Sequence, residues 1–269
     1  MPELKRPDGA VIYYEVIGEG EPVLCLGGWG TFCHGNTGGM PFGLTDRYQV
    51  VIMDYRGLAE STDNVASEAT MGLYADDAIA VLDALGLTKV HLLGMVGIGA
   101  CICQLIAIDR PDLARSLVNT GAWASCDPLL AEQLKLFVDI HREAGWATFQ
   151  RFVCAYSFDP DFYNANAHRI VGPQGPWREL IDKIPTHERF IEASLTHDVI
   201  EQLASVQCPS FVLHAGQDTI TGPRTTMPIA NALPNCTSLT FEEAAHVLAG
   251  KELRQRFSTA LFDFFDGVN

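Results

Sequence analysis

The sequence of 269 residues predicts an α/β fold with a mostly parallel central sheet, helices on both faces and an inserted helical lid. Short apolar runs of strand length alternate with longer segments whose apolar residues recur at helical spacing. This alternation indicates a parallel sheet that helices cover on both faces. Between residues 125 and 206 this alternation stops and amphipathic helical patterns replace it. We therefore expect a core of residues 1–124 and 207–269 and a lid of residues 125–206.

The first part of the chain contains five candidate strands and two candidate helices. The helix expected from Met71 has Leu73, Ile79 and Leu82 at helical spacing and ends before Gly86, a residue that commonly stops helices. The apolar runs read as strands because each is short and bounded by turn residues. The expected strands cover residues 10–16, 23–26, 49–53, 89–93 and 116–119, and the expected helices cover residues 71–85 and 97–108.

The second part begins with the insertion and then resumes the alternation. Two segments of the insertion are amphipathic, PLLAEQLKLFVDIHREAGWATFQRFV and ERFIEASLTHDVIEQLASV, and both are read as helical. The strands that follow are expected at residues 210–214 and 238–241, with helices near 224–232 and at 252–265. The late return of strands implies that the core sheet is completed only after the insertion.

Composition limits the partners that this protein can have. Lys and Arg total 18 against 33 Asp and Glu, a formal charge of −15, which argues against nucleic acid and against an anionic membrane surface. No apolar stretch is long enough to span a bilayer and no signal peptide is visible, so we expect a cytoplasmic protein. The eight cysteines form no CxxC pair and the histidines show no ligand spacing, so no metal site is expected. A homodimer is left open.

Five segments carry a resemblance to a known family. LCLGGWG (24–30), MDYRGLAEST (53–62), VHLLGMVGIG (90–99), VLHAGQDTITGP (212–223) and FEEAAHVLAGKE (241–252) follow one another in this order. They resemble the oxyanion loop, the strand and turn after it, the nucleophile elbow, the acid segment and the histidine segment of the α/β-hydrolase superfamily. The segment after the elbow and the lid resemble the enol-lactonase and polyketide methyl-esterase branch. This resemblance implies the α/β-hydrolase fold over nearly the whole chain.

The elbow segment departs from the family pattern because it contains no serine. Relatives carry G-x-S-x-G there, a tight turn that projects the serine above the sheet. Counting from Gly94 places Val96 at the serine position, whereas a second register places Gly97 there with Gly99 closing the turn. Neither side chain can attack a substrate, so the sequence predicts an enzyme that forms no acyl intermediate at this position.

The remaining catalytic parts are predicted from the resemblance. Asp218 and His246 occupy the acid and histidine segments, so we expect His246 to be a base that Asp218 orients. The backbone N–H groups of Gly28, Trp29 and Gly97, or Ile98 in place of Gly97, are expected to form an oxyanion hole. Relatives usually carry a histidine where this chain has Gly27, which removes one side-chain anchor of that loop.

A pocket for a small apolar or aromatic molecule is expected between the core and the lid. His34 follows the oxyanion loop and Trp123 follows the strand at 116–119, so both are candidates for its lining. The lid adds aromatic residues, of which Phe152 and Tyr156 are expected to line the pocket. The chain has no G-x-G-x-x-G phosphate loop in a dinucleotide-binding context, so no cofactor is expected.

Three functions are compatible with these residues. The first is a non-hydrolytic enzyme, such as a lyase, isomerase, cyclase or cofactor-free oxygenase, in which His246 removes a proton from a bound substrate. The second is a hydrolase of esters, lactones or carbon–carbon bonds that acts through activated water, or an engineered variant of such an enzyme that lacks its nucleophile. The third is a ligand-binding protein without activity. The retained Asp218 and His246 favour an enzyme over the third hypothesis.

Overall fold

The computed structural model describes residues 2–268 and contains an eight-stranded sheet in the order β1-β2-β4-β3-β5-β6-β7-β8. From β4 to β8 neighbouring strands are parallel, whereas β1 and β2 pair antiparallel with their neighbours. The predicted mostly parallel sheet is therefore confirmed. The strands are β1 (Glu3–Lys5), β2 (Val11–Ile17), β3 (Glu21–Leu26), β4 (Tyr48–Met53), β5 (Val90–Met95), β6 (Ala114–Thr120), β7 (Ser210–Ala215) and β8 (Cys236–Phe241).

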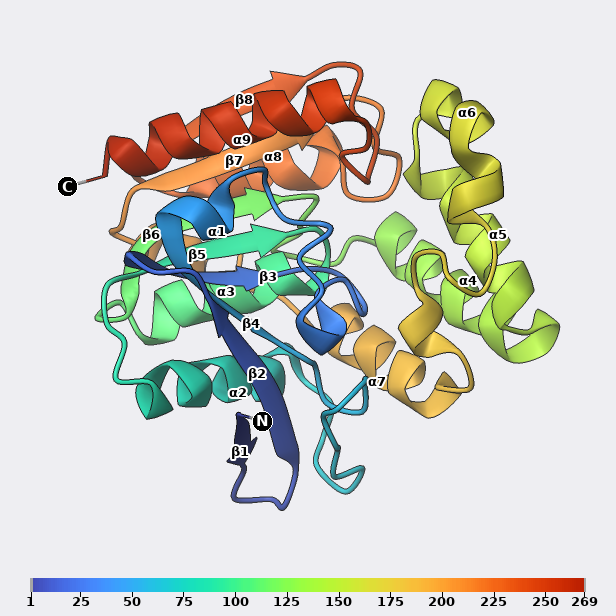
Figure 1. Cartoon of the computed structure of the whole chain (residues 1–269), viewed down its shortest axis with the longest axis horizontal. Helices are drawn as coiled ribbons and strands as arrows, with labels where there is room; N and C mark the ends of the chain where they lie inside the picture. The colour runs from blue at the N-terminus through green and yellow to red at the C-terminus, as the bar shows by residue number, and fades with distance from the viewer. Residues whose placement is uncertain (1, 269) are drawn as a thin grey trace.

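Helices cover both faces of this sheet (Figure 1). In β3, Leu24 and Leu26 belong to one buried cluster while Val23 and Cys25 belong to the cluster on the opposite face, because successive strand side chains point to opposite sides. The first cluster packs α2 (Met71–Ala84), α3 (Ile98–Asp109) and α8 (Pro223–Ala232) against the sheet, and the second packs α1 (Leu44–Arg47) and α9 (Lys251–Asp266). The alternation of strand-like and helix-like segments in the sequence correctly indicated a sheet with helices on both faces.

Four helices between β6 and β7 form the inserted segment. They are α4 (Pro128–Ala144), α5 (Trp146–Ser157), α6 (Pro160–Ile170) and α7 (Ile184–Leu195), and they lie together beyond the ends of the strands (Figure 1). The first amphipathic stretch is two helices, because Gly145 adopts a φ of 79° between them. The second stretch is helical only to Leu195 and ends in a short 3₁₀ turn, Gln202–Ser205. The sequence reading did not identify α6, which has no buried residue and so lacks the apolar face that the reading relied on.

The sequence also gave no sign of β1. This strand is only three residues long and lies at the sheet edge, where polar side chains such as Glu3 and Lys5 are exposed. Among residues 2–268 we find no helix with the length and apolar character that crossing a bilayer requires. The division into a core and a lid domain stays a prediction, since the structure shows where the inserted helices lie but not that they act as a lid.

Several buried histidines make stability depend on pH. Burial lowers the pKa of His187 to about 3 and the pKa values of His91 and His197 to about 4. His187 shares a hydrogen bond with His141, Nδ1 to Nδ1 at 3.1 Å, which requires that at least one ring be neutral. Unfolding exposes these rings, whose pKa then returns to about 6.5. The unfolded chain therefore binds more protons than the folded chain between about pH 6.5 and pH 4.

We expect the free energy of unfolding to be fully developed above pH 6.5 and to fall as the pH drops towards 4, by about 1.4 kcal/mol per pH unit for each of these histidines. Urea unfolding at pH 7.5, 6 and 5 measures this slope. His197→Gln removes one of these titrating groups, so the free energy of unfolding should fall less steeply as the pH drops. His168→Gln, at an exposed histidine, should leave the slope unchanged. A free energy of unfolding independent of pH over this range contradicts the prediction.

Candidate active site

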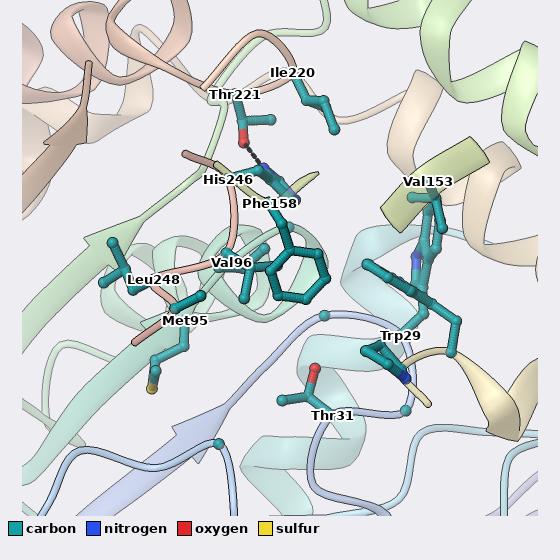
Figure 2. A pocket seen from close by; sticks show the side chains of 18 of the residues that line it. Trp29, Thr31, Met95, Val96, Val153, Phe158, Ile220, Thr221, His246 and Leu248 are labelled. Atoms are coloured by element: carbon teal, nitrogen blue, oxygen red, sulfur yellow. Dashed lines mark hydrogen bonds between the residues drawn. The ribbon is translucent and has the colours of Figure 1, made fainter. Parts of the chain in front are cut away.

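A cavity of about 460 Å³ lies between the carboxyl ends of the parallel strands and the inserted helices. Its walls come from the loop after β3, the turn between β5 and α3, the loop after β7 and the loop before α9. Figure 2 shows His246, Val96, Phe158 and Trp29 around this space. Leu130, Leu134 and other apolar side chains of the inserted helices complete the lining, so a bound ligand would be largely removed from water.

The turn between β5 and α3 is held by two close backbone approaches. A Cβ atom on Gly94 would collide with the backbone of Ala100 in α3, and one on Gly99 would come within 2.6 Å of the carbonyl groups of Leu26 and Gly27. Only glycine fits at either position, which explains why strand and helix can pack so tightly there. These two glycines have the packing role that the sequence pattern assigns to the glycines of an elbow.

The turn is one residue longer than the G-x-S-x-G pattern. Four residues separate Gly94 from Gly99, where the pattern has three between its glycines. Two adjacent residues accordingly adopt positive φ, Val96 at 62° and Gly97 at 66°. For a β-branched residue this backbone is a strained outlier that costs about 1–3 kcal/mol. The extra residue explains why the sequence alone offered two registers.

The geometry favours Gly97 over Val96 as the apex of the turn. α3 begins directly after Gly97, and a Cβ atom placed on Gly97 would meet only the Cα of Gly28, at 3.9 Å. A side chain there would therefore point into open space beside the loop after β3. Val96 also lines the cavity, with its side chain below the His246 ring in Figure 2.

His246 and Asp218 come together as the sequence reading expected. Nδ1 of His246 lies 3.0 Å from Oδ2 of Asp218, although 28 positions separate the two residues. The Asp218 carboxylate also accepts the backbone N–H groups of Ile220 and Thr221, at 2.8 and 2.9 Å through Oδ1. The side chain of Asp218 is fully buried and that of His246 is 11% exposed, so the pair sits at the cavity wall.

The charges of the pair define which histidine nitrogen is free. Burial raises the pKa of Asp218, but the neighbouring His246 and the backbone N–H groups outweigh this effect and hold that pKa below its ordinary value. Because an ionised carboxylate has no proton to give, Nδ1 of His246 must be the donor. Nε2 then carries the lone pair, and no described residue in 2–268 forms a hydrogen bond with it.

Thr221 is a part of this site that the sequence reading missed. Its hydroxyl donates to Oδ2 of Asp218 at 3.1 Å. The same hydroxyl lies 3.0 Å from Nδ1 of His246, as Figure 2 shows, so it braces both members of the pair. The signal was present only as a threonine three residues after the acid, a spacing that many unrelated turns share.

The expectation for Gly97 in the oxyanion hole is wrong in one respect. The Gly97 N–H donates to the carbonyl oxygen of Gly121 at 2.9 Å and is therefore already occupied. The N–H groups of Trp29 and Ile98 have no hydrogen-bond partner among residues 2–268, and both residues line the cavity together with Gly28. These two donors come from the two loops that the sequence reading selected, so Trp29 and Ile98 replace Gly97 as the candidate pair.

Of the other residues that were predicted to line the pocket, one lies in the lining and three do not. Trp123 is buried and lines the cavity. His34, Phe152 and Tyr156 lie outside its lining: His34 is at the surface between Glu60 and Glu179, while Phe152 packs against Tyr156, which is 43% exposed. The residues that take their places in the lining include Phe158, Phe162 and Trp177. Sequence could supply the aromatic composition of the insertion but not which face of each helix turns to the cavity.

The side chains that commonly bind metal ions are dispersed through the described part of the chain. Across residues 2–268, no three His, Cys, Asp or Glu side chains gather in a way that could hold a metal ion. The eight cysteines are all free thiols.

Comparisons with known proteins agree with this architecture. The sequence model described as the alpha/beta hydrolase fold matches residues 21–252. A relative named "Putative carbamate hydrolase RutD" from Caulobacter sp. (strain K31) is 26% identical over 212 residues, which cover 79% of this chain and 77% of the relative.

Two solved structures are similar over almost the whole chain. A hydrolase from Pseudomonas aeruginosa PA01 has a TM-score of 0.83 at 24% identity, covering 98% of this chain and 97% of that one. The enol-lactonase from Burkholderia xenovorans LB400 also has a TM-score of 0.83, at 16% identity, covering 98% and 100%. At these identities the likeness shows the fold alone and carries no information on the substrate.

Replacing the apex of the turn by serine tests the geometry of the elbow. We expect Gly97→Ser to hydrolyse p-nitrophenyl acetate at a rate about tenfold or more above that of the unmodified protein. The new serine hydroxyl would enter open space, and the next residue, Ile98, has an unpaired backbone N–H. Val96→Ser should gain less, since the N–H that follows it is bonded to Gly121. Initial rates and the burst of p-nitrophenol distinguish the two variants. A larger gain in Val96→Ser reverses the assignment.

Proposed function

Because the chain belongs to the α/β-hydrolase fold family, we propose that it is an enzyme in which His246, oriented by Asp218, is a general base acting on a small organic substrate without a covalent enzyme intermediate. One observation carries this proposal. Nε2 of His246 has no hydroxyl or thiol partner among the described residues, whereas a nucleophile would donate its hydrogen bond to this nitrogen.

No other side chain takes the place of the absent serine. The hydroxyl groups in the cavity lining belong to Thr31, Thr120 and Thr221. Thr221 is on the Asp218 side of the imidazole, and Thr120 accepts the Val96 N–H at 3.2 Å. Among residues 2–268, no cysteine belongs to the cavity lining. Cys33, which follows the loop after β3, is buried outside it, and burial raises the pKa of its thiol well above the ordinary value, so it stays protonated.

The cavity suits proton abstraction. A base in a water-poor site removes a proton from an acidic C–H or O–H, and the negative charge that develops on a substrate oxygen can be stabilised by the unpaired N–H groups of Trp29 and Ile98. Such chemistry needs a base, orientation and exclusion of water, none of which depends on a serine. Decarboxylation, isomerisation, cyclisation, carbon–carbon cleavage and cofactor-free oxygenation all begin or proceed in this way.

Hydrolysis by activated water is the second candidate. Its support is the name of the relative described as a carbamate hydrolase, together with the free Nε2, which could remove a proton from a water molecule as readily as from a substrate. In that reaction the same two N–H groups would stabilise a tetrahedral intermediate. The two candidates share every residue of the site and differ in the group that His246 deprotonates.

A probe that needs only a base tests the first candidate. In 5-nitrobenzisoxazole a base removes the ring C–H proton while the N–O bond breaks, and the product is a coloured cyanonitrophenolate. We expect catalysis of this elimination by the unmodified protein and a loss of about 100-fold or more in His246→Gln, because the substitution removes the imidazole that faces the cavity. His168→Gln, at an exposed histidine outside the cavity, is the matched control and should keep the rate.

The same proteins report on the alternatives. A rate in His246→Gln equal to that of the unmodified protein contradicts a general base at this position. Steady hydrolysis of p-nitrophenyl acetate that depends on His246 but shows no burst supports activated water. A burst stoichiometric with the enzyme shows a covalent intermediate and overturns the proposal in both forms.

A further inference from the structure

Arg254 lines the cavity as a cation without an acidic partner. It lies in α9, and its guanidinium stacks on the ring of Phe42 at 4.3 Å. Nη2 donates to the carbonyl oxygens of Gly38 and Met40, at 2.9 and 2.7 Å. Nε and Nη1 donate to no described residue, and neither atom is sealed off from the cavity or solvent.

This arrangement differs from that of the other arginines. Of the 13 arginines in the sequence, ten form an ion pair with a carboxylate in the described part of the chain, as Arg56 does with Asp77 and Asp8. The other three are Arg151, Arg169 and Arg254, and the first two are exposed at the surface. Arg254 is therefore the one partly buried arginine in residues 2–268 whose charge no carboxylate balances.

The lack of a carboxylate is notable in a protein with a net charge of −15. A partly buried guanidinium loses hydration, and a pairing group normally compensates this loss. Burial lowers the pKa of Arg254 from its ordinary value, in accordance with a cation that the protein itself does not neutralise. The acidic residue in the cavity lining, Glu179, is already engaged by His34 and Arg178.

We propose that the substrate carries a carboxylate that pairs with the free Nε and Nη1 groups of Arg254, and that this pairing positions the rest of the molecule towards His246. The proposal rests on the function proposed above, because it names the class of substrate that the general base would act on. A guanidinium presents parallel N–H donors that match the two oxygens of a carboxylate. A phosphate dianion fits less well, since a single arginine supplies one positive charge.

The remainder of the lining indicates the rest of the substrate. The rest of the lining is mainly apolar, with Trp123, Leu134 and Phe137 among its residues. A cavity of about 460 Å³ is the size of a small molecule. An aryl- or alkyl-substituted carboxylic acid would place its apolar part on these walls and its charge at Arg254.

Binding of matched acids and amides tests the proposal without requiring turnover. The probes are benzoate, phenylacetate and 4-phenylbutyrate, each compared with its neutral amide by isothermal titration calorimetry. We expect at least one acid to bind the unmodified protein about tenfold or more tightly than its amide, because charge-assisted hydrogen bonds exceed neutral ones. Arg254→Gln should abolish this preference, and Arg254→Lys, which keeps the charge, should retain part of it.

Two controls separate this outcome from misfolding and from the catalytic proposal. Arg256→Gln, two residues further along α9 at an exposed ion pair with Glu243, should leave the preference for the acid unchanged. His246→Gln should also keep the preference, so the carboxylate site can stand even if the general base fails. The proposal is overturned if no acid binds more tightly than its amide, or if Arg254→Gln, with an unchanged melting temperature, binds the acids as before.

Discussion

The close packing of α3 against β3 and β5 is the constraint on which the site depends. Gly94 and Gly99 allow contacts that a single added Cβ would prevent, and the short turn between them is forced through two residues of positive φ. This turn places Val96 and Gly97 at the floor of the cavity and leaves the first N–H of α3, that of Ile98, without an internal partner. The turn that the sequence prediction compared with a nucleophile elbow therefore keeps close packing of strand and helix, and no serine lies between its two glycines.

The candidate site contains the pair of Asp218 and His246 and has no serine in the turn between β5 and α3. Asp218 is buried, ionised and hydrogen-bonded on every side, so it fixes the tautomer of His246 and leaves Nε2 facing the cavity. A buried carboxylate loses hydration, and these hydrogen bonds offset that loss. Retention of this pair is the physical reason for favouring an enzyme over a receptor.

The inserted helices contribute to the site through packing as well as through lining. The ring of Trp29, in the loop after β3, meets Phe137 of α4 edge-on at 6.3 Å and His187 of α7 at 4.7 Å. The loop that carries the backbone N–H of Trp29 therefore packs against two of the inserted helices, α4 and α7. His187 is neutral because it is buried, so acidification would loosen these helices and this loop together.

The sequence by itself indicated most of the strands and helices and the insertion between β6 and β7, because periodicity encodes these features, although β1 and α6 were missed. The pairing of Asp218 with His246 followed from the resemblance of their segments to a known family. The sequence could not choose between Val96 and Gly97, since it shows the extra residue in the turn but only the structure shows that α3 begins directly after Gly97. The occupation of the Gly97 N–H by Gly121, the support from Thr221 and the unpaired charge of Arg254 likewise depend on residues far apart in the chain. Only tertiary structure decided them, because a hydrogen bond or its absence is a property of distance in space.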